Sequence, residues 1–271
     1  MSNFKNSIFI VAVIIFSGCS EKEVIIPPFQ IEDAGRTVLI EELTGVRCPN
    51  CPSANARLES IKFLYGDNII KVAIHGDLLT LPLPESRFDF RNPHASLLEN
   101  SFRPLLGKPS IVINRKILPG FNLMANPVQD QWQSLIESEL QKEQILGMTA
   151  SISEREENWI IDVAILPVIP VVGNLSIHAF VIENHIIDPQ QDVNTIIMDY
   201  EHNNVFRRMI TPIEGHFLGD RFESNSIIQH AITWDRNTLS PLGQEDHLHL
   251  VLFITNGNGE VEHAVQYRLR I

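Results

Sequence analysis

Cys48-Pro49-Asn50-Cys51 lies between two segments of different periodicity, and this placement constrains the fold more than any other feature. Residues 38–43 form a short apolar run that predicts a strand and ends at Thr44-Gly45. After the cysteines, apolar residues recur at helical spacing and predict an amphipathic helix: Ala54, Leu58, Ile61 and Tyr65. The sequence therefore predicts a pair of sulfur atoms, one helical turn apart, where a buried strand passes into a helix.

A thiolate on Cys48 gains stability at the start of a helix, because unpaired N–H groups and the helix dipole favour an anion there. We therefore expect a lowered pKa for Cys48, and the fixed positive charge of Arg47 acts in the same direction. Pro49 suits the first helical position, since its missing N–H would have been unpaired. Pro52 fits less well and allows the helix to begin one residue later.

Two other interpretations of the pair stay open beside redox chemistry. A zinc site needs four ligands, and the only further cysteine is Cys19, so histidines would have to complete it. A purely structural disulfide is the second alternative, although closing so short a loop stabilises a fold by only about 2 kcal/mol or less. Redox chemistry of Cys48 and Cys51 is the interpretation we favour.

Further elements of the first half follow from its apolar runs and its proline pairs. Residues 69–75 predict a second, buried strand, and residues 110–113 a third strand that turns at Asn114-Arg115 into residues 116–118. Asn92-Pro93 and Asn126-Pro127 each predict a helix, with Asn as the N-cap and Pro at the first helical position. The expected order is β-α-β, a helix, a β-hairpin and a closing helix, which is the order of the thioredoxin fold.

The first half resembles the thioredoxin superfamily in its strand-turn-Cys-x-x-Cys-helix arrangement, in an acid six residues before Cys48, and in Gly107-Lys108-Pro109-Ser110. The resemblance implies that Pro109 follows a cis bond and that the backbone of Lys108 pairs with an extended substrate chain. It also implies that Glu42 is a buried acid that accepts the proton of Cys51, while Glu41 faces the opposite side and is solvated. Arg47 replaces the usual tryptophan, and Pro-Asn the usual Gly-Pro, so the reduction potential stays open.

From residue 147 the pattern changes to period two, which predicts strands and no long helix. Asn-Gly between alternating runs, at residues 256–259, predicts a hairpin. We expect a thioredoxin-like domain at residues 36–146, followed by an all-β antiparallel, immunoglobulin-like sandwich of six to eight strands at residues 147–271. The second half holds 17 acidic and 7 basic residues, a net charge of −10, which favours solubility or an acidic, cation-attracting face.

The N-terminus has the pattern of a secretory signal: Lys5 precedes nine apolar residues at 8–16, too few to span a membrane. Ser17-Gly18-Cys19 then resembles the lipobox of bacterial lipoproteins, which implies residues 1–18 as signal peptide and Cys19 as the lipidated residue. A plain signal peptide with a coincidental Cys is the alternative. Residues 19–35 predict a flexible tether, and its acidic start resembles the signal that directs lipoproteins of Bacteroidetes-type bacteria to the outer membrane.

A closer resemblance covers nearly the whole mature chain. Residues 42–45, Cys51-Pro52, residues 72–75 and His202-Asn203-Asn204-Val205-Phe206-Arg207 are similar to the twenty-eight-kilodalton outer-membrane protein family of these bacteria. The resemblance implies a lipoprotein with a thioredoxin-like part, anchored in the outer membrane and facing the periplasm or the cell surface.

Other candidate sites carry less information. His75 ends a strand at its carboxyl edge and is either a substrate contact or proton carrier, or a satisfied histidine. His247 and His249 form a possible metal pair with no third ligand identified, so we expect no metal and no cofactor. With 33 acidic against 21 basic residues, a nucleic-acid partner is not expected.

These patterns predict a lipid-anchored thiol–disulfide oxidoreductase of the cell envelope, with protein thiols or disulfides as partners and the membrane reached through Cys19. In this hypothesis Cys48 attacks, Cys51 resolves and Glu42 handles the proton, while Arg47, Lys108 and Pro109 meet the substrate. The alternative is a surface lipoprotein that binds a partner through its β-sandwich, with the thioredoxin-like part as scaffold, so the sequence leaves open whether the protein is an enzyme.

Overall fold

The computed structural model describes residues 35–239 and 242–269. The predicted signal peptide, Cys19 and the tether up to residue 34 lie outside the described residues. Among the residues it does describe, no helix is long and apolar enough to cross a membrane.

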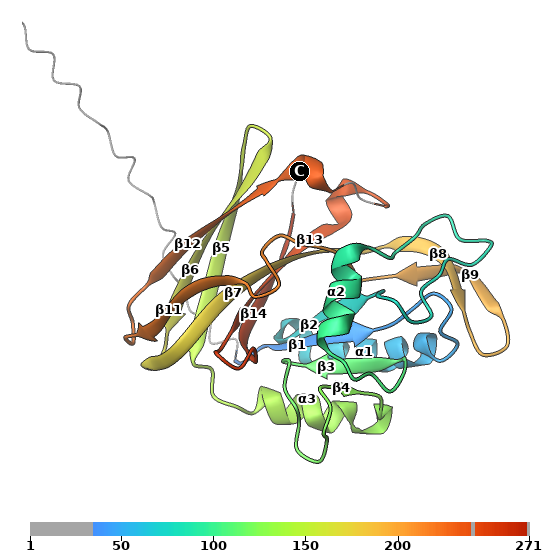
Figure 1. Cartoon of the computed structure of the whole chain (residues 1–271), viewed down its shortest axis with the longest axis horizontal. Coiled ribbons are helices and arrows are strands. Elements are labelled where there is room, and N and C mark those ends of the chain that lie inside the picture. Colours follow the sequence, from blue (N-terminus) through green and yellow to red (C-terminus); the bar gives the residue numbers. More distant parts are fainter. Residues whose placement is uncertain (1–34, 240–241, 270–271) are drawn as a thin grey trace, which may run out of the picture. The chain divides into compact units, whose positions relative to one another are not determined.

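The first half follows the predicted order of elements, with strands and helices alternating around a small sheet (Figure 1). In chain order these are β1 (Val38–Leu43), α1 (Cys51–Tyr65), β2 (Ile69–Ile74), α2 (Pro93–Ser101), β3 (Ser110–Ile113), β4 (Ala125–Asn126) and α3 (Trp132–Leu140). A 3-10 turn, Gly66–Asn68, joins α1 to β2, and another, Gln129–Gln131, precedes α3. The strands lie in the order β2-β1-β3-β4, with β1 parallel to β2 and antiparallel to β3. This pairing is that of a thioredoxin-like fold.

The two predicted Asn-Pro caps have different outcomes. The side chain of Asn92 accepts a hydrogen bond of 2.9 Å from the N–H of Ala95, so the predicted cap of α2 is confirmed. Asn126 instead lies in β4, and its side chain accepts from the N–H of Val128, so the cap predicted there was wrong. The hairpin strand predicted at residues 116–118 was also wrong, because β3 pairs with β4, farther along the chain.

The second half is β-rich, as predicted, and its only described helical segments are two short 3-10 turns, Arg236–Thr238 and Glu245–His247. Its strands are β5 (Leu146–Arg155), β6 (Asn158–Pro167), β7 (Val171–Glu183), β8 (Ile186–Gln191), β9 (Ile196–His202), β10 (Val205–Met209), β11 (His216–Phe222), β12 (Ile228–Asp235), β13 (Leu248–Thr255) and β14 (Val261–Arg268). Strands β12, β6 and β5 form one sheet and β8 pairs with β9 in a separate hairpin. The predicted Asn-Gly turn joins β13 to β14, which pair antiparallel.

Strand β10 connects the two halves. It pairs antiparallel with β7 and parallel with β2, so a single nine-stranded sheet runs in the order β14-β13-β7-β10-β2-β1-β3-β4, with β11 added beside β7. The N–H of Ala73 in β2 donates to the carbonyl of Asn204 at 2.7 Å. The predicted division into separate domains at residue 147 stays a prediction.

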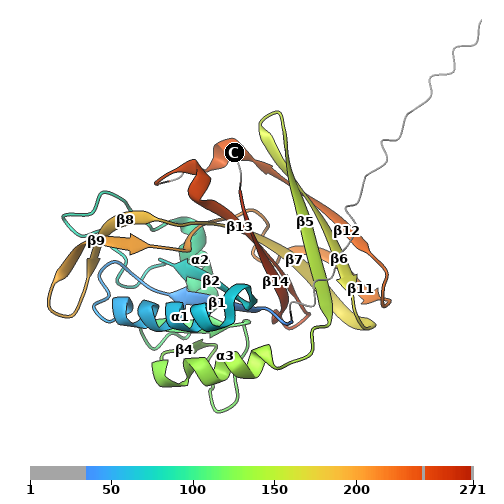
Figure 2. The same cartoon turned by 180° about the vertical axis from the view of Figure 1, so that it is seen from behind.

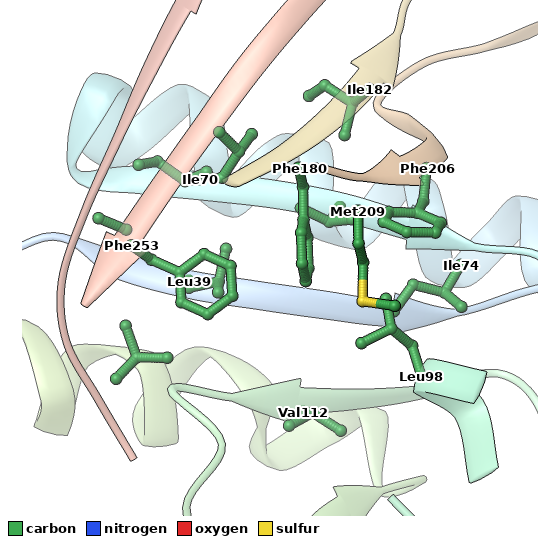
Figure 3. Packing of buried hydrophobic residues seen from close by; sticks show 14 of the residues in the cluster. Leu39, Ile70, Ile74, Leu98, Val112, Phe180, Ile182, Phe206, Met209 and Phe253 are labelled. Carbon is green, nitrogen blue, oxygen red and sulfur yellow. The ribbon is translucent and has the colours of Figure 1, made fainter. Parts of the chain in front are cut away.

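Both faces of the β1 region are covered, which explains why β1 and β2 are buried at every position. Figures 1 and 2 show α2 on one face of these strands and α1 and α3 on the other. The α2 face carries a core built from both halves, in which Phe180 of β7 meets Phe206 of β10 and Phe253 of β13 with ring centroids 5.2 and 4.9 Å apart (Figure 3). A separate cluster joins β5, β6 and β12 to β7, β13 and β14.

Candidate functional site

Cys48 and Cys51 form a disulfide, with their Cα atoms 5.3 Å apart. Helix α1 begins at Cys51. Cys48 therefore lies one turn ahead of the helix, whereas the sequence predicted it at the start of the helix. The intervening turn is closed by the N–H of Cys51, which donates to the carbonyl of Cys48 at 3.2 Å. Pro52 is therefore the helix-starting proline, because an amide at that position needs no intrahelical acceptor.

Both cysteines are buried: Cys48 is 0% and Cys51 2% exposed. The side-chain amide of Gln190 in β8 donates to the carbonyls of Gly45 and Cys48, each at 3.2 Å. The N–H of Gln191 donates to the carbonyl of Val46 at 2.8 Å. The β8–β9 hairpin, which arrives from the second half, therefore covers the dithiol loop.

The loop at residues 76–91 packs against the same turn. A Cβ at Gly45 would lie 2.3 Å from the carbonyl oxygen of Leu79, so only glycine permits this close approach. The N–H of Arg87 donates to Asp188 of β8 at 2.8 Å, which links this loop to the hairpin. The loop and the β8–β9 hairpin therefore form one continuous cover.

Arg47 is held by this loop. Its guanidinium donates to the carbonyls of Leu81 and Pro82 at 2.9 and 2.6 Å. The predicted contact of Arg47 with a substrate stays a prediction, and its side chain already has two backbone partners.

The Lys108–Pro109 peptide bond is cis, as the resemblance implied. Ser110 pairs with Leu43, so Pro109 lies beside the end of β1, from which the dithiol loop departs. The Lys108 side chain is 0% exposed, and its ammonium donates to the carbonyl of Thr44 at 2.8 Å and lies 2.6 Å from Glu99. Because the residue as a whole is half-buried, its exposed part is backbone, the part to which the resemblance assigns substrate pairing.

Glu42 is buried on the α1 face of β1, as predicted, and burial raises its pKa, although the nearby cation of Lys71 acts in the opposite direction. The Lys71 ammonium lies 3.5 Å from Oε2 of Glu42, and Oε1 has no hydrogen-bond partner. A small cavity of about 20 Å³, room for about one water molecule, is lined by Glu42 together with Cys51, Asn55, His75, Tyr200 and His202, among others. The half-paired carboxyl thus shares a cavity with the second cysteine of the disulfide.

Glu41 differs from the expectation that it is solvated. It is fully buried on the opposite face, where Arg115 binds both of its carboxylate oxygens, at 2.6 and 2.9 Å. The expectation failed because β10, β7 and β13 extend the sheet and cover this face.

Two histidines line the cavity, and both are held in the neutral form. Burial lowers the pKa of His202 to about 4 and the pKa of His75 well below its usual range. The Nε2–H of His202 donates to the carbonyl of Asp188 at 3.2 Å. Sequence reasoning missed Gln190, Tyr200 and His202 as parts of this site, and the one available signal was the motif at residues 202–207.

The possible metal pair His247 and His249 lies at the start of β13. His249 bonds the side chain of Asn184, and among residues 35–239 and 242–269 no group of three His, Cys, Asp or Glu side chains could hold a metal ion.

Fold and site together define a thioredoxin-like protein with a Cys-x-x-Cys disulfide at the start of its first helix. The family model described as Outer membrane protein Omp28 matches residues 98–270, and the chain belongs to this family. The family name associates the protein with the outer membrane. The dithiol precedes the matched segment, so the family match does not cover it.

Among solved structures, HBP35 of Porphyromonas gingivalis is similar at 13% identity and a TM-score of 0.65, over 87% of this chain and 76% of that one. This similarity shows a shared fold. Protein AGR_C_4864 from Agrobacterium tumefaciens is similar at 10% identity and a TM-score of 0.49, over 88% of this chain and 98% of that one. No curated protein matches the sequence.

Proposed function

We propose that this protein is a lipid-anchored thiol–disulfide oxidoreductase of the cell envelope that acts through Cys48 and Cys51. The observation that carries the proposal is the disulfide between these residues beside a cavity that also holds the half-paired carboxyl of Glu42. A structural disulfide needs no proton acceptor, whereas dithiol exchange does.

In the reducing direction, the Cys48 thiolate attacks one sulfur of a substrate disulfide, and the other substrate sulfur leaves as a thiolate. Cys51 then attacks Cys48 of the mixed disulfide, loses its proton to Glu42 and releases the second substrate thiolate. The substrate disulfide gains two electrons, and Cys48 and Cys51 become the disulfide. Oxidation of a substrate dithiol follows the same steps in reverse.

The family and the N-terminal sequence support the proposed location. Outer-membrane association comes with the Omp28 family, and the lipobox resemblance supports attachment through a lipid on Cys19, with the folded part facing the periplasm or the cell surface. An envelope location suits this chemistry, because disulfides form and persist outside the cytoplasm.

Access to the dithiol requires displacement of the β8–β9 hairpin, because Cys48 has no exposed surface in the closed arrangement. When the hairpin moves away, the carbonyls of Gly45, Val46 and Cys48 lose partners in β8. An extended substrate chain can then bind these groups and the exposed backbone of Lys108.

The burial of both cysteines favours a second candidate, a surface lipoprotein that binds a partner through its second half. In this proposal the strands of the second half form the immunoglobulin-like sandwich, supported by the apolar cluster between β5, β6, β12 and β7, β13, β14. The disulfide is then part of a scaffold.

Reactivity of the reduced protein separates the two candidates. If the protein is an oxidoreductase, an alkylating agent modifies Cys48 with a rate that reaches half its maximum well below about pH 8, and the reduced protein reduces insulin. In Cys51→Ser the alkylation rate is that of Cys48 alone, and mixed disulfides with a substrate are trapped because no second thiol resolves them. Cys48→Ser is the control that traps none. A Cys48 thiol that stays unreactive up to pH 9, together with no insulin reduction, supports the binding protein. If the protein does reduce insulin, equilibration with glutathione gives the reduction potential of the Cys48–Cys51 pair.

A further inference from the structure

The β8–β9 hairpin does more than cover the dithiol, because it brings a phenol to the charged groups beneath it. Asn55 of α1 donates through Nδ2 to the hydroxyl of Tyr200 in β9 at 2.9 Å. Tyr200 lines the same cavity as Glu42 and Cys51. Burial raises the pKa of Tyr200 to about 12, so its hydroxyl stays neutral.

The opposite end of the Asn55 amide faces a cation. Its Oδ1 accepts a hydrogen bond from the ammonium of Lys71, which also bonds Glu59 and lies 3.5 Å from Glu42. The Lys71 side chain is almost fully buried, so these three groups replace its water.

The amide of Asn55 has only one useful orientation here. With Nδ2 toward Tyr200 and Oδ1 toward Lys71, both ends are satisfied. A flipped amide would point its N–H groups at a cation, so Lys71 fixes the observed orientation, in which the Tyr200 hydroxyl is the acceptor for Nδ2.

We propose that Tyr200 is a positioning residue that, through Asn55, holds the Lys71 ammonium beside the carboxyl of Glu42. The proposal deepens the proposed function, on which it rests, since it assigns to the hairpin a part in adjusting the proton acceptor of Cys51. Because the hairpin that covers the site also carries Tyr200, closure of the hairpin sets the position of Lys71 and so adjusts Glu42 as a proton acceptor.

Several other groups act on Glu42 and have to be kept constant. Lys71 favours its carboxylate, whereas Glu59 of α1 disfavours it. His75 after β2 and His202 of β9 line the cavity, and burial keeps both neutral. Cys51 is in the disulfide and does not titrate in the oxidised protein.

The test is a titration of the Glu42 side-chain carboxyl by ¹³C NMR in the oxidised protein, without any substrate. In Tyr200→Phe the ring can keep its edge contact with His202, whose ring centroid lies 4.7 Å from that of Tyr200 in the unchanged protein, while Asn55 loses its acceptor. Lys71 is then held less firmly, its favourable effect on the carboxylate weakens, and the Glu42 midpoint moves up by about 0.5 to 1 pH unit. Tyr267→Phe is the matched control, since Tyr267 accepts from the N–H of Ala150 in the second half, and it leaves the midpoint unchanged.

A double-mutant cycle tests the route through Asn55. Asn55→Ala raises the midpoint like Tyr200→Phe, and the double variant adds nothing further, because both changes break one connection. An unchanged midpoint in Tyr200→Phe, or fully additive shifts, overturns the proposal. Because the titration needs no exchange activity, a protein that titrates as expected yet reduces no substrate disproves the proposed function and leaves this inference standing.

Discussion

Glu41 and Glu42 are neighbours on β1, yet the strand directs them to opposite faces of the sheet and into different electrostatic surroundings. Both carboxyls are buried. Arg115 binds both oxygens of Glu41, and its guanidinium lies 4.7 Å from the ring centroid of Phe253. Lys71 approaches one oxygen of Glu42 at 3.5 Å and leaves the other unpartnered beside the disulfide.

The difference separates a structural carboxylate from a chemical one. Two charge-assisted hydrogen bonds to a planar guanidinium engage both carboxylate oxygens of Glu41. Glu42 has a free oxygen, a raised pKa and a shared cavity with Cys51, which suit it to exchange a proton.

The largest expected effect is on stability. Glu41→Gln leaves the largely buried side chain of Arg115 without its counter-charge and lowers the free energy of unfolding by about 3 to 5 kcal/mol, measured by urea denaturation of the oxidised protein. Adding Arg115→Met removes the unpaired charge and restores much of this loss. A cost below about 1 kcal/mol, the value of a surface pair, would mean that this pair contributes no more to stability than an exposed one.

The second effect is on chemistry. Glu42→Gln removes the proton acceptor and slows the resolution of a mixed disulfide by about 10²-fold at pH 7, measured by stopped-flow release of a thiol leaving group. Its effect on stability follows pH in a defined direction. Because burial raises the folded pKa of Glu42 above the ordinary value of 4.5, ionisation costs stability as pH rises from 4.5 to the folded pKa. Glu42→Gln therefore gains stability relative to the wild type over that range. Resolution at the wild-type rate would remove Glu42 from the mechanism.

The smallest effect concerns the access of a reductant to the disulfide beside Glu42. Gln190→Ala removes the hydrogen bonds from β8 to Gly45 and Cys48, worth about 1 kcal/mol in the closed arrangement, so the hairpin opens about fivefold more often. We expect reduction of the disulfide by dithiothreitol to be faster by that factor. Gln191→Ala is the control, since its side chain bonds only Asp192 and Thr195 within the hairpin region. Equal rates in both variants would falsify gating by the hairpin.

Much of the first half was predictable because its signals are local. The order of elements and the cap at Asn92 depend on residues a few positions apart, and the structure confirms them. The burial of Glu42, which the resemblance to the thioredoxin superfamily implied, is confirmed as well. The failures at Glu41 and at residues 116–118 share a cause: each depended on strands outside the segment that carried the signal, β4 in one case and strands of the second half in the other.

The sequence by itself determined that a strand, a cysteine pair and an amphipathic helix follow one another, since periodicity and turn residues act over one or two turns. Only the tertiary structure decided that a hairpin carrying Gln190 and Tyr200 covers this pair, and that Lys71 approaches one acid while Arg115 encloses the other. The Asn55–Tyr200 bond joins residues 145 positions apart, and such partners are selected by packing and by the need to satisfy buried polar groups. A run of residues does not contain that information until the chain has folded.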